Sequence, residues 1–387
     1  MHDTDGEGPA ASGAEVPEAV EGASADETLI EATMTARRAF SLLAVALAVL
    51  LIILLVLLYL LLSPRGLITR GGSAIAGLEP VLTIEGPGRG SDPVFRRPMD
   101  AAIGVNDRIY VVDSDNNRIA VFTRRGRFLF DFGGFGLAKP LPGFEATWEE
   151  GLLNFPLGID IDDRGDVYVA DFRNDQIQVF DAEGEFLRRF PDPNERVGQG
   201  GSGQDGTGIA VTDVAVAGDY VYATDSYQVV VFTTRGEFVR QFGRPGVEPG
   251  AFDRPNGITV AADGTIVVAD SNNARIQAFS PEGQLRWAVG RGVHVSGITG
   301  EQRDDRDALF GLPRGVAALD DGTIAVVDSF EYEIVLLSAD GEIIGRYGQR
   351  GVDPGQLNLP NGIGGAGDMV IVADKENNRA QLLRLVK

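Results

Sequence analysis

The chain of 387 residues contains no cysteine and only two histidines, His2 and His294. Without cysteine there are no disulfide bonds, no thiolate nucleophile and no zinc site built on sulfur. His294 is the only histidine outside the extreme N-terminus, so the chain cannot assemble a zinc site of three histidines. A Ser-His-Asp triad would have to use His294, and no nucleophile motif surrounds that residue.

Basic residues are also scarce, with 34 Lys and Arg against 56 Asp and Glu, and the formal net charge is −22. Proteins that bind nucleic acids usually cluster Lys and Arg, because binding releases the cations condensed on the phosphates. A surface with this excess of acids repels phosphate backbones. We therefore expect no nucleic-acid partner.

The first 76 residues differ in composition from the rest of the chain. Residues 1–36 carry nine acidic side chains, no Lys and no Arg, and few large apolar residues. Such a segment buries too little apolar surface to offset the entropy of ordering, so we expect a disordered acidic tail. Residues 63–76 are interpreted as a linker.

Between the tail and the linker, residues 39–62 form an apolar run of 24 residues. A helix of this length reaches about 36 Å, which is enough to cross a hydrocarbon core of about 30 Å. The run is longer than the apolar part of a signal peptide, and it predicts a single-pass membrane anchor. Two arginines flank it on each side. Orientation is therefore left open by the charge rule, and we favour an extracytoplasmic C-terminal domain.

Residues 77–387 contain an internal repeat. Six apolar strands each end in an aspartate, at Asp113, Asp171, Asp225, Asp270, Asp328 and Asp374. Each of these strands follows another short strand and precedes a third, and in five repeats a tight turn leads to a fourth. Four short antiparallel strands repeated six times predict an all-β fold, a six-bladed β-propeller. The sixth repeat has three strands, and we expect residues 81–86 to supply the fourth and close the ring.

The loops after these aspartates resemble NHL repeats. The pattern is an aspartate, then asparagines, then arginine and isoleucine, and residues 113–119, 270–276 and 374–379 match it best. The resemblance implies a six-bladed propeller of NHL type, in which the Asp and the Arg pair across a hairpin. Gln176 and Glu333 replace the Arg in two repeats, and the third repeat has a shorter loop. We expect those hairpins to be held differently, for example by packing.

The resemblance leaves several activities to weigh. Similar propellers include an amidating lyase that uses several histidines, calcium-dependent lactonases, and NHL domains that bind RNA or are attached to RING ubiquitin ligases. The single internal histidine argues against the lyase, the missing cysteines exclude a RING domain, and the acidic charge argues against RNA. The lactonase remains an alternative, since Asp100, Asp213 and Asn256 can converge on the channel.

Long irregular links between repeats fall on one face of the predicted propeller, the face that also carries the Asp-to-Arg hairpins. Binding sites favour such a face. Two groups of residues on this face are candidates for binding. The first is a set of aromatic residues in the hairpins, whose alternative role is to pack the loops. The second is a set of residues at the mouth of the channel, whose alternative role is to satisfy loop carbonyls. The candidates are Phe172, Tyr227, Phe330 and Tyr332 in the hairpins, and Arg97, Asp100, Asn256, Arg314 and Asn361 at the mouth.

The sequence favours a membrane-anchored binding or scaffolding propeller that is not an enzyme. We expect a protein or a small polar ligand to dock on the face with the long links. No catalytic residue, metal site or cofactor is assigned. The alternative is a calcium-dependent hydrolase of the lactonase type, with carboxylates at the channel mouth.

Overall fold

The computed structural model describes residues 77–88, 94–138, 149–192, 194, 197, 208–290 and 309–386, together with Leu47, Leu50, Leu51 and Leu54. The chain divides into two compact units, Met1–Gly71 and Gly72–Lys387. Within the described residues, none of the helices has the length and apolar character needed to cross a membrane. The predicted span 39–62 falls outside them except for the four leucines, which are helical and more than half exposed. The predicted tail (residues 1–36) and the predicted linker (residues 63–76) also lie outside them.

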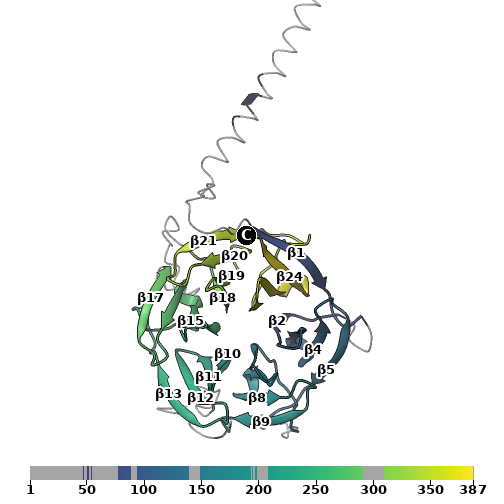
Figure 1. Ribbon diagram of the computed structural model, residues 1–387, viewed down its shortest axis with the longest axis vertical. Helices are drawn as coiled ribbons and strands as arrows, with labels where there is room; N and C mark the ends of the chain where they lie inside the picture. The colour runs from purple at the N-terminus through teal and green to yellow at the C-terminus, as the bar shows by residue number, and fades with distance from the viewer. Residues whose placement is uncertain are drawn as a thin grey trace, which may run out of the picture. The chain divides into compact units, whose positions relative to one another are not determined.

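The second unit is a six-bladed β-propeller, as the sequence predicts (Figure 1). Blade 1 contains β2 (Pro98–Ile103), β3 (Arg108–Asp113), β4 (Arg118–Thr123) and β5 (Phe128–Gly133). Blade 2 contains β6 (Ile159–Ile161), β7 (Val167–Asp171), β8 (Gln176–Phe180) and β9 (Phe186–Phe190). Blade 3 contains β10 (Val211–Ala217), β11 (Tyr220–Asp225), β12 (Gln228–Thr233) and β13 (Phe238–Phe242).

The remaining blades repeat this order from the channel outward. Blade 4 contains β14 (Gly257–Val260), β15 (Ile266–Asp270), β16 (Arg275–Phe279) and β17 (Leu285–Gly290). Blade 5 contains β18 (Pro313–Ala318), β19 (Ile324–Asp328), β20 (Glu333–Leu337) and β21 (Ile343–Tyr347). Blade 6 contains β22 (Ile363–Ala366), β23 (Met369–Asp374) and β24 (Arg379–Val386). Short 3₁₀ turns follow four second strands: η1 (Ser114–Asn116), η2 (Phe172–Asn174), η3 (Ser271–Asn273) and η5 (Lys375–Asn377).

The N-terminal strand of this unit closes the ring. β1 (Gly77–Ile84) pairs antiparallel with β24, from Gly77 opposite Val386 to Ile84 opposite Ala380. It therefore supplies the outer strand that blade 6 lacks, and the sequence prediction is confirmed. Closure in this way covers the edge that an unfinished blade would expose.

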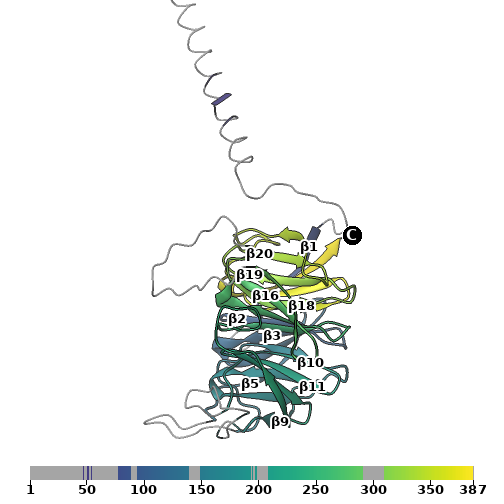
Figure 2. The same cartoon turned by 90° about the vertical axis from the view of Figure 1, so that its left-hand side faces the viewer.

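The hydrophobic core lies between blades. Six clusters of buried apolar side chains are present, and each joins two neighbouring blades around the ring. The second and third strands are buried on both sides, because each face of a blade packs on the next blade. This explains why these segments read as nearly continuous apolar runs. Figure 2 shows the propeller from its edge, with strands such as β3 and β11 running across its thickness.

A buried aspartate at the end of each second strand organises the face that carries the links. In blade 4, Asp270 Oδ2 accepts hydrogen bonds from Arg275 Nε (2.7 Å) and Asn273 Nδ2 (2.9 Å), and Oδ1 accepts one from the backbone N–H of Asp253 (2.8 Å). The Arg275 guanidinium also donates to the carbonyls of Val247 (2.6 Å), Glu248 (3.0 Å) and Ala251 (2.7 Å). One Asp–Arg pair thus fixes the hairpin and the link that enters the blade.

The same arrangement recurs with Asp113 and Arg118 in blade 1, and with Asp374 and Arg379 in blade 6. The prediction of an Asp–Arg pair is therefore confirmed in the three blades that keep the pattern. In all three, an asparagine and the backbone N–H of a residue in the incoming link donate to the same carboxylate.

The hairpins of the other three blades are held differently, as predicted, but by hydrogen bonds and an ion pair and not by packing alone. In blades 2 and 3, the amides of Gln176 and Gln228 each donate to the aspartate at 2.9 Å. In blade 5, Glu333 forms an ion pair with Arg346, and Asp328 accepts the backbone N–H groups of Gly311 (2.6 Å) and Leu312 (2.8 Å). A buried carboxylate needs donors, so a hydrogen-bond donor is found wherever the Arg is missing.

Replacement of Arg275 by alanine should destabilise the protein strongly. The side chain is 3% exposed, and its loss leaves the Asp270 carboxylate buried without its cation and removes a hydrogen-bond donor from three link carbonyls. We expect a loss of about 3–5 kcal/mol in the free energy of unfolding, measured by urea denaturation of the full chain. The control is Arg286→Ala, which removes an exposed pair with Asp263 and should cost at most about 1 kcal/mol. Equal losses in the two variants would contradict the role assigned to Arg275.

Candidate functional site

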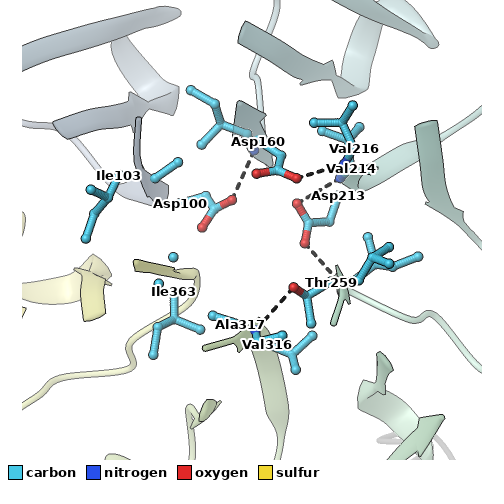
Figure 3. A pocket seen from close by; sticks show the side chains of 17 residues that line it. Asp100, Ile103, Asp160, Asp213, Val214, Val216, Thr259, Val316, Ala317 and Ile363 are labelled. Carbon is cyan, nitrogen blue, oxygen red and sulfur yellow. Dashed lines mark hydrogen bonds between the residues drawn. The ribbon is translucent and has the colours of Figure 1, made fainter. Parts of the chain in front are cut away.

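The six inner strands surround a central channel that contains a cavity of about 180 Å³. Most of its lining residues are valine, isoleucine, alanine and glycine, and all six blades contribute to them. Three carboxylates, those of Asp100, Asp160 and Asp213, also line it. Figure 3 shows these aspartates together on one half of the wall, with apolar side chains such as Ile363 and Ala317 on the other half.

Each channel aspartate joins its own strand to the inner strand of the next blade. Asp100 Oδ2 accepts the N–H of Ile159 (3.0 Å), Asp160 Oδ2 accepts that of Val216 (2.7 Å), and Asp213 Oδ2 accepts that of Ile258 (2.9 Å). The other oxygen of each carboxylate accepts the N–H of the residue that follows the aspartate. An inner strand is a sheet edge with unpaired N–H groups, and these carboxylates satisfy them.

Neighbouring inner strands approach one another closely at the level of Asp100 and Asp213. At the same level the other four inner strands carry glycine, namely Gly158, Gly257, Gly315 and Gly362. A Cβ on Gly158 would lie 2.2 Å from Asp213 Oδ1, and one on Gly362 would lie 2.0 Å from Asp100 Oδ1. Neighbouring strands therefore approach too closely for a larger residue at these two positions.

Burial changes the titration of the three channel aspartates. It raises the pKa of Asp100 to about 7 and that of Asp160 to about 6, despite the hydrogen bonds from backbone N–H groups that favour ionisation. Burial raises the pKa of Asp213 well above its usual range, and the charge of Asp100 adds to the effect. Asp100 and Asp213 therefore do not both ionise readily at neutral pH.

Beyond this level, on the face with the links, lies a small second cavity of about 10 Å³. Four residues predicted for the channel mouth line it together: Asp100, Asn256, Arg314 and Asn361. Arg97 is not among its lining residues; its side chain is half exposed, with NH1 3.8 Å from Asp115 Oδ1. A binding role for these residues stays a prediction.

Two of the mouth residues have the structural role that we considered as the alternative. Asn256 Nδ2 donates to the carbonyl of Arg254 (3.3 Å), and Asn361 Nδ2 donates to that of Met99 (2.9 Å). The second bond links blade 6 to blade 1. Satisfying backbone carbonyls thus accounts for both amide groups, but not for Arg314.

The four predicted aromatics lie in hairpins of three different blades. Phe172 belongs to blade 2, Tyr227 to blade 3, and Phe330 and Tyr332 to blade 5. Tyr227 and Phe330 are 40% and 48% exposed, whereas Phe172 and Tyr332 are partly buried, and Arg350 lies 5.4 Å from the Tyr332 ring centroid. None of the four lines either cavity. The structure therefore distributes them over the face instead of gathering them into one pocket.

Sequence reasoning missed two residues of this region. Asp160 lies between two isoleucines in the first strand of blade 2. An acidic residue at this position of an inner strand could have been predicted to line the channel. Lys375 begins η5 on blade 6 and is half-buried. Burial lowers its pKa, the adjacent Glu376 raises it, and the charges of Arg314 and Arg97 lower it further.

The residues that line the small cavity can be compared with the needs of a calcium-dependent hydrolase. Asp100, Asp213 and Asn256 do line the same small cavity, but the cation Arg314 shares it with them. Over the described ranges, no three His, Asp or Glu side chains are grouped so as to hold a metal ion. All four oxygens of the two carboxylates already accept backbone N–H groups. This arrangement favours a structural role for the two carboxylates.

The raised pKa values predict how stability changes with pH. Asp100 and Asp160 keep protons in the folded protein that the unfolded chain releases near the ordinary pKa of 3.8. Their contribution to stability is therefore present below about pH 4 and is lost as the pH rises towards about 7. Carboxyl ¹³C NMR should show midpoints near 7 for Asp100 and near 6 for Asp160. Asp263 is the control, because hydrogen bonds from Thr265 lower its pKa. Midpoints near 4 for both channel residues would refute the burial argument.

Comparison with known proteins identifies the repeat. The family model described as "NHL repeat" matches residues 95–122, 153–180 and 252–279, which belong to blades 1, 2 and 4. The chain is similar to the brain tumor protein of Drosophila melanogaster, with 29% identity over 38% of this chain and 13% of that protein. It is also similar to a probable peptidyl-alpha-hydroxyglycine alpha-amidating lyase of Caenorhabditis elegans, with 25% identity over 51% of this chain and 59% of the lyase.

The chain thus spans only 13% and 59% of the lengths of these two relatives. Among solved structures, a Bacteroides thetaiotaomicron protein of unknown function aligns with a TM-score of 0.53 at 18% identity, over 80% of this chain and 76% of that one. A Xanthomonas campestris gluconolactonase aligns with a TM-score of 0.51 at 12% identity, over 82% and 99%. At these identities the likeness concerns the fold alone. The chain is a six-bladed β-propeller that carries NHL repeats.

Proposed function

We propose that this chain is a membrane-anchored propeller that acts by docking a protein on the face with the links, and that it is not an enzyme. The observation that carries the proposal is the distribution of exposed apolar side chains. Among the described residues of the propeller that lie outside its outermost strands, seven large ones lie on that face and two on the opposite face; five more, Val81, Leu187, Phe238, Val239 and Leu285, lie in the outermost strands themselves. The seven are Val94, Phe135, Tyr227, Val247, Leu309, Phe330 and Val352, and the two are Val105 and Tyr220.

Exposed apolar and aromatic side chains gathered on one face are typical of protein interaction sites. Val247 and Val352 support this reading most directly. They are 39% and 70% exposed, and they occupy equivalent places in the links that enter blades 4 and 6. Their carbonyls accept hydrogen bonds from Arg275 and Arg379, so the backbone that presents them is fixed. A fixed loop loses little entropy when a partner binds.

The membrane anchor and its orientation are part of the same proposal. The apolar run at residues 39–62 is long enough to span a bilayer, and a propeller joined to it would hold its partner at the membrane surface. We place the propeller on the extracytoplasmic side. The anchor rests on sequence alone, whereas the docking face rests on the exposed side chains.

Site-specific photocrosslinking in membranes of the producing cell tests the docking face. A photoreactive residue at Val352 or Phe330 should give protein adducts, whereas the same residue at Val105 on the opposite face should give none. Val352→Glu should weaken adduct formation at Phe330, because a charge would be desolvated in the interface. The matched control Val105→Glu should leave it unchanged. Adducts from Val105 alone would refute the proposed face.

The same membranes test the anchor. Deletion of residues 39–62 should move the protein from the pellet to the supernatant after extraction at high pH, while deletion of residues 1–36 should leave it in the pellet. A protein that sediments equally with and without residues 39–62 would refute the anchor and leave the docking proposal standing.

A further inference from the structure

Arg314 is the one mouth residue that the fold does not explain. It is the second residue of β18, between Pro313 and Gly315, and it lines the small cavity at the channel mouth. Its Nε is buried and has no hydrogen-bond partner. In the described part of the chain, no carboxylate forms an ion pair with its guanidinium. Burial lowers its pKa, and no neighbouring charge or hydrogen bond acts in the other direction.

Two further cations lie on the next two blades of the ring, Lys375 at the start of η5 in blade 6 and Arg97 just before β2 in blade 1. Lys375 of blade 6 feels the charges of both Arg314 of blade 5 and Arg97 of blade 1, and these lower its pKa in addition to burial. Arg97 and Lys375 are each partly neutralised, by Asp115 at 3.8 Å and by Glu376 at 3.4 Å. Arg314 has no such neighbour. Three blades that are adjacent in the ring thus bring three cations together at the mouth.

This gathering of cations is unexpected in a chain with a net charge of −22. Like charges in proximity repel, and a partly buried guanidinium whose Nε has no hydrogen-bond partner costs stability. Elsewhere on this face, arginines serve the fold, as Arg275 and Arg379 do through their pairs with Asp270 and Asp374. Arg314 makes no comparable contact. A residue that lowers the stability of the free protein and makes no structural contact is typical of a binding site.

We propose that Arg314, with Lys375 and Arg97 beside it, binds a carboxylate group at the channel mouth. A guanidinium matches the planar, two-oxygen geometry of a carboxylate. The cavity of about 10 Å³ has room for only one small group. Asp100 and Asp213 line the same cavity, and burial raises the pKa of both carboxyl groups, so they repel an anion less than ordinary carboxylates would. The mouth lies at the centre of the proposed docking face. We therefore infer that the docked protein carries this carboxylate, at its C-terminus or on an acidic side chain. Only this last step rests on the proposed function.

Calorimetric titration of the detergent-solubilised full chain tests the site without the docking partner. The probes are acetate, inorganic phosphate, and a short apolar peptide with either a free or an amidated C-terminus. We expect the free peptide to bind and the amidated peptide to bind at least about tenfold more weakly, because it lacks the charge that pairs with Arg314. Equal binding of the two peptides, or tighter binding of phosphate than of acetate, would overturn the assignment of a carboxylate.

Variants separate binding from folding. Arg314→Gln should weaken binding of the free peptide by about tenfold, and Lys375→Gln by less, since Lys375 already has a partner. The matched control is Arg164→Gln, which removes the same charge from an exposed side chain that pairs with Asp162 in the turn between β6 and β7. It should leave binding unchanged. Equal effects of Arg314→Gln and Arg164→Gln would overturn the proposal.

Stability provides a second readout that a structural role would not give. Arg314→Gln should leave the urea midpoint of the ligand-free protein unchanged or raise it, because it removes an uncompensated buried charge. Arg314→Lys keeps the charge and should retain part of the binding. A large loss of stability in Arg314→Gln would identify Arg314 as a structural residue and overturn the proposal. If the peptide binds as expected but photocrosslinking finds no partner on this face, the carboxylate site stands and the docking function fails.

Discussion

The fold of this propeller depends on burying one carboxylate at the end of every second strand. All six of these aspartates are fully buried. A charge in such a place costs several kcal/mol unless donors surround it, so hairpin, link and strand must all direct N–H groups towards it. Asp270 illustrates the result, because a link N–H, an asparagine and an arginine converge on one carboxylate. The irregular segments of the face with the links are therefore as constrained as the strands.

A second set of carboxylates performs a related task in the channel. The innermost strand of each blade has no partner strand on its inner side, and its N–H groups would remain unsatisfied. Asp100, Asp160 and Asp213 accept some of these groups and join consecutive blades. Acids inside a propeller channel resemble a catalytic or metal-binding set in a sequence. Here the hydrogen bonds that the carboxylate oxygens accept account for the three aspartates as structural residues. The candidate binding residues therefore lie on the face with the links and at the channel mouth.

Much of the fold could be predicted from the sequence, because it is encoded in contacts that are local and repeated. The six aspartates, the hairpin pairs and the missing strand of blade 6 are visible as a periodic pattern. Replacement of the Arg by Gln176 was misread as a loss of hydrogen bonding, since a pattern match does not show that an amide can supply the same donor. The surroundings of Arg314 were out of reach, because Lys375 lies one blade further along the chain and Arg97 belongs to the first blade, which only ring closure brings next to blade 6. Candidate residues could thus be named from the sequence, but their partners could not.

The central claim is that buried aspartates hold the face with the links rigid, so that it is ready to bind. Hydrogen exchange of the full chain, without any partner, tests it most directly. The backbone N–H groups of Arg96, Asn154, Asp253 and Asn358 each donate to one of these aspartates, although they lie in links. The account predicts that they exchange as slowly as amides within β3, β7, β15 and β23, through opening of the whole blade. Exchange within seconds, as in an unstructured loop, would contradict it.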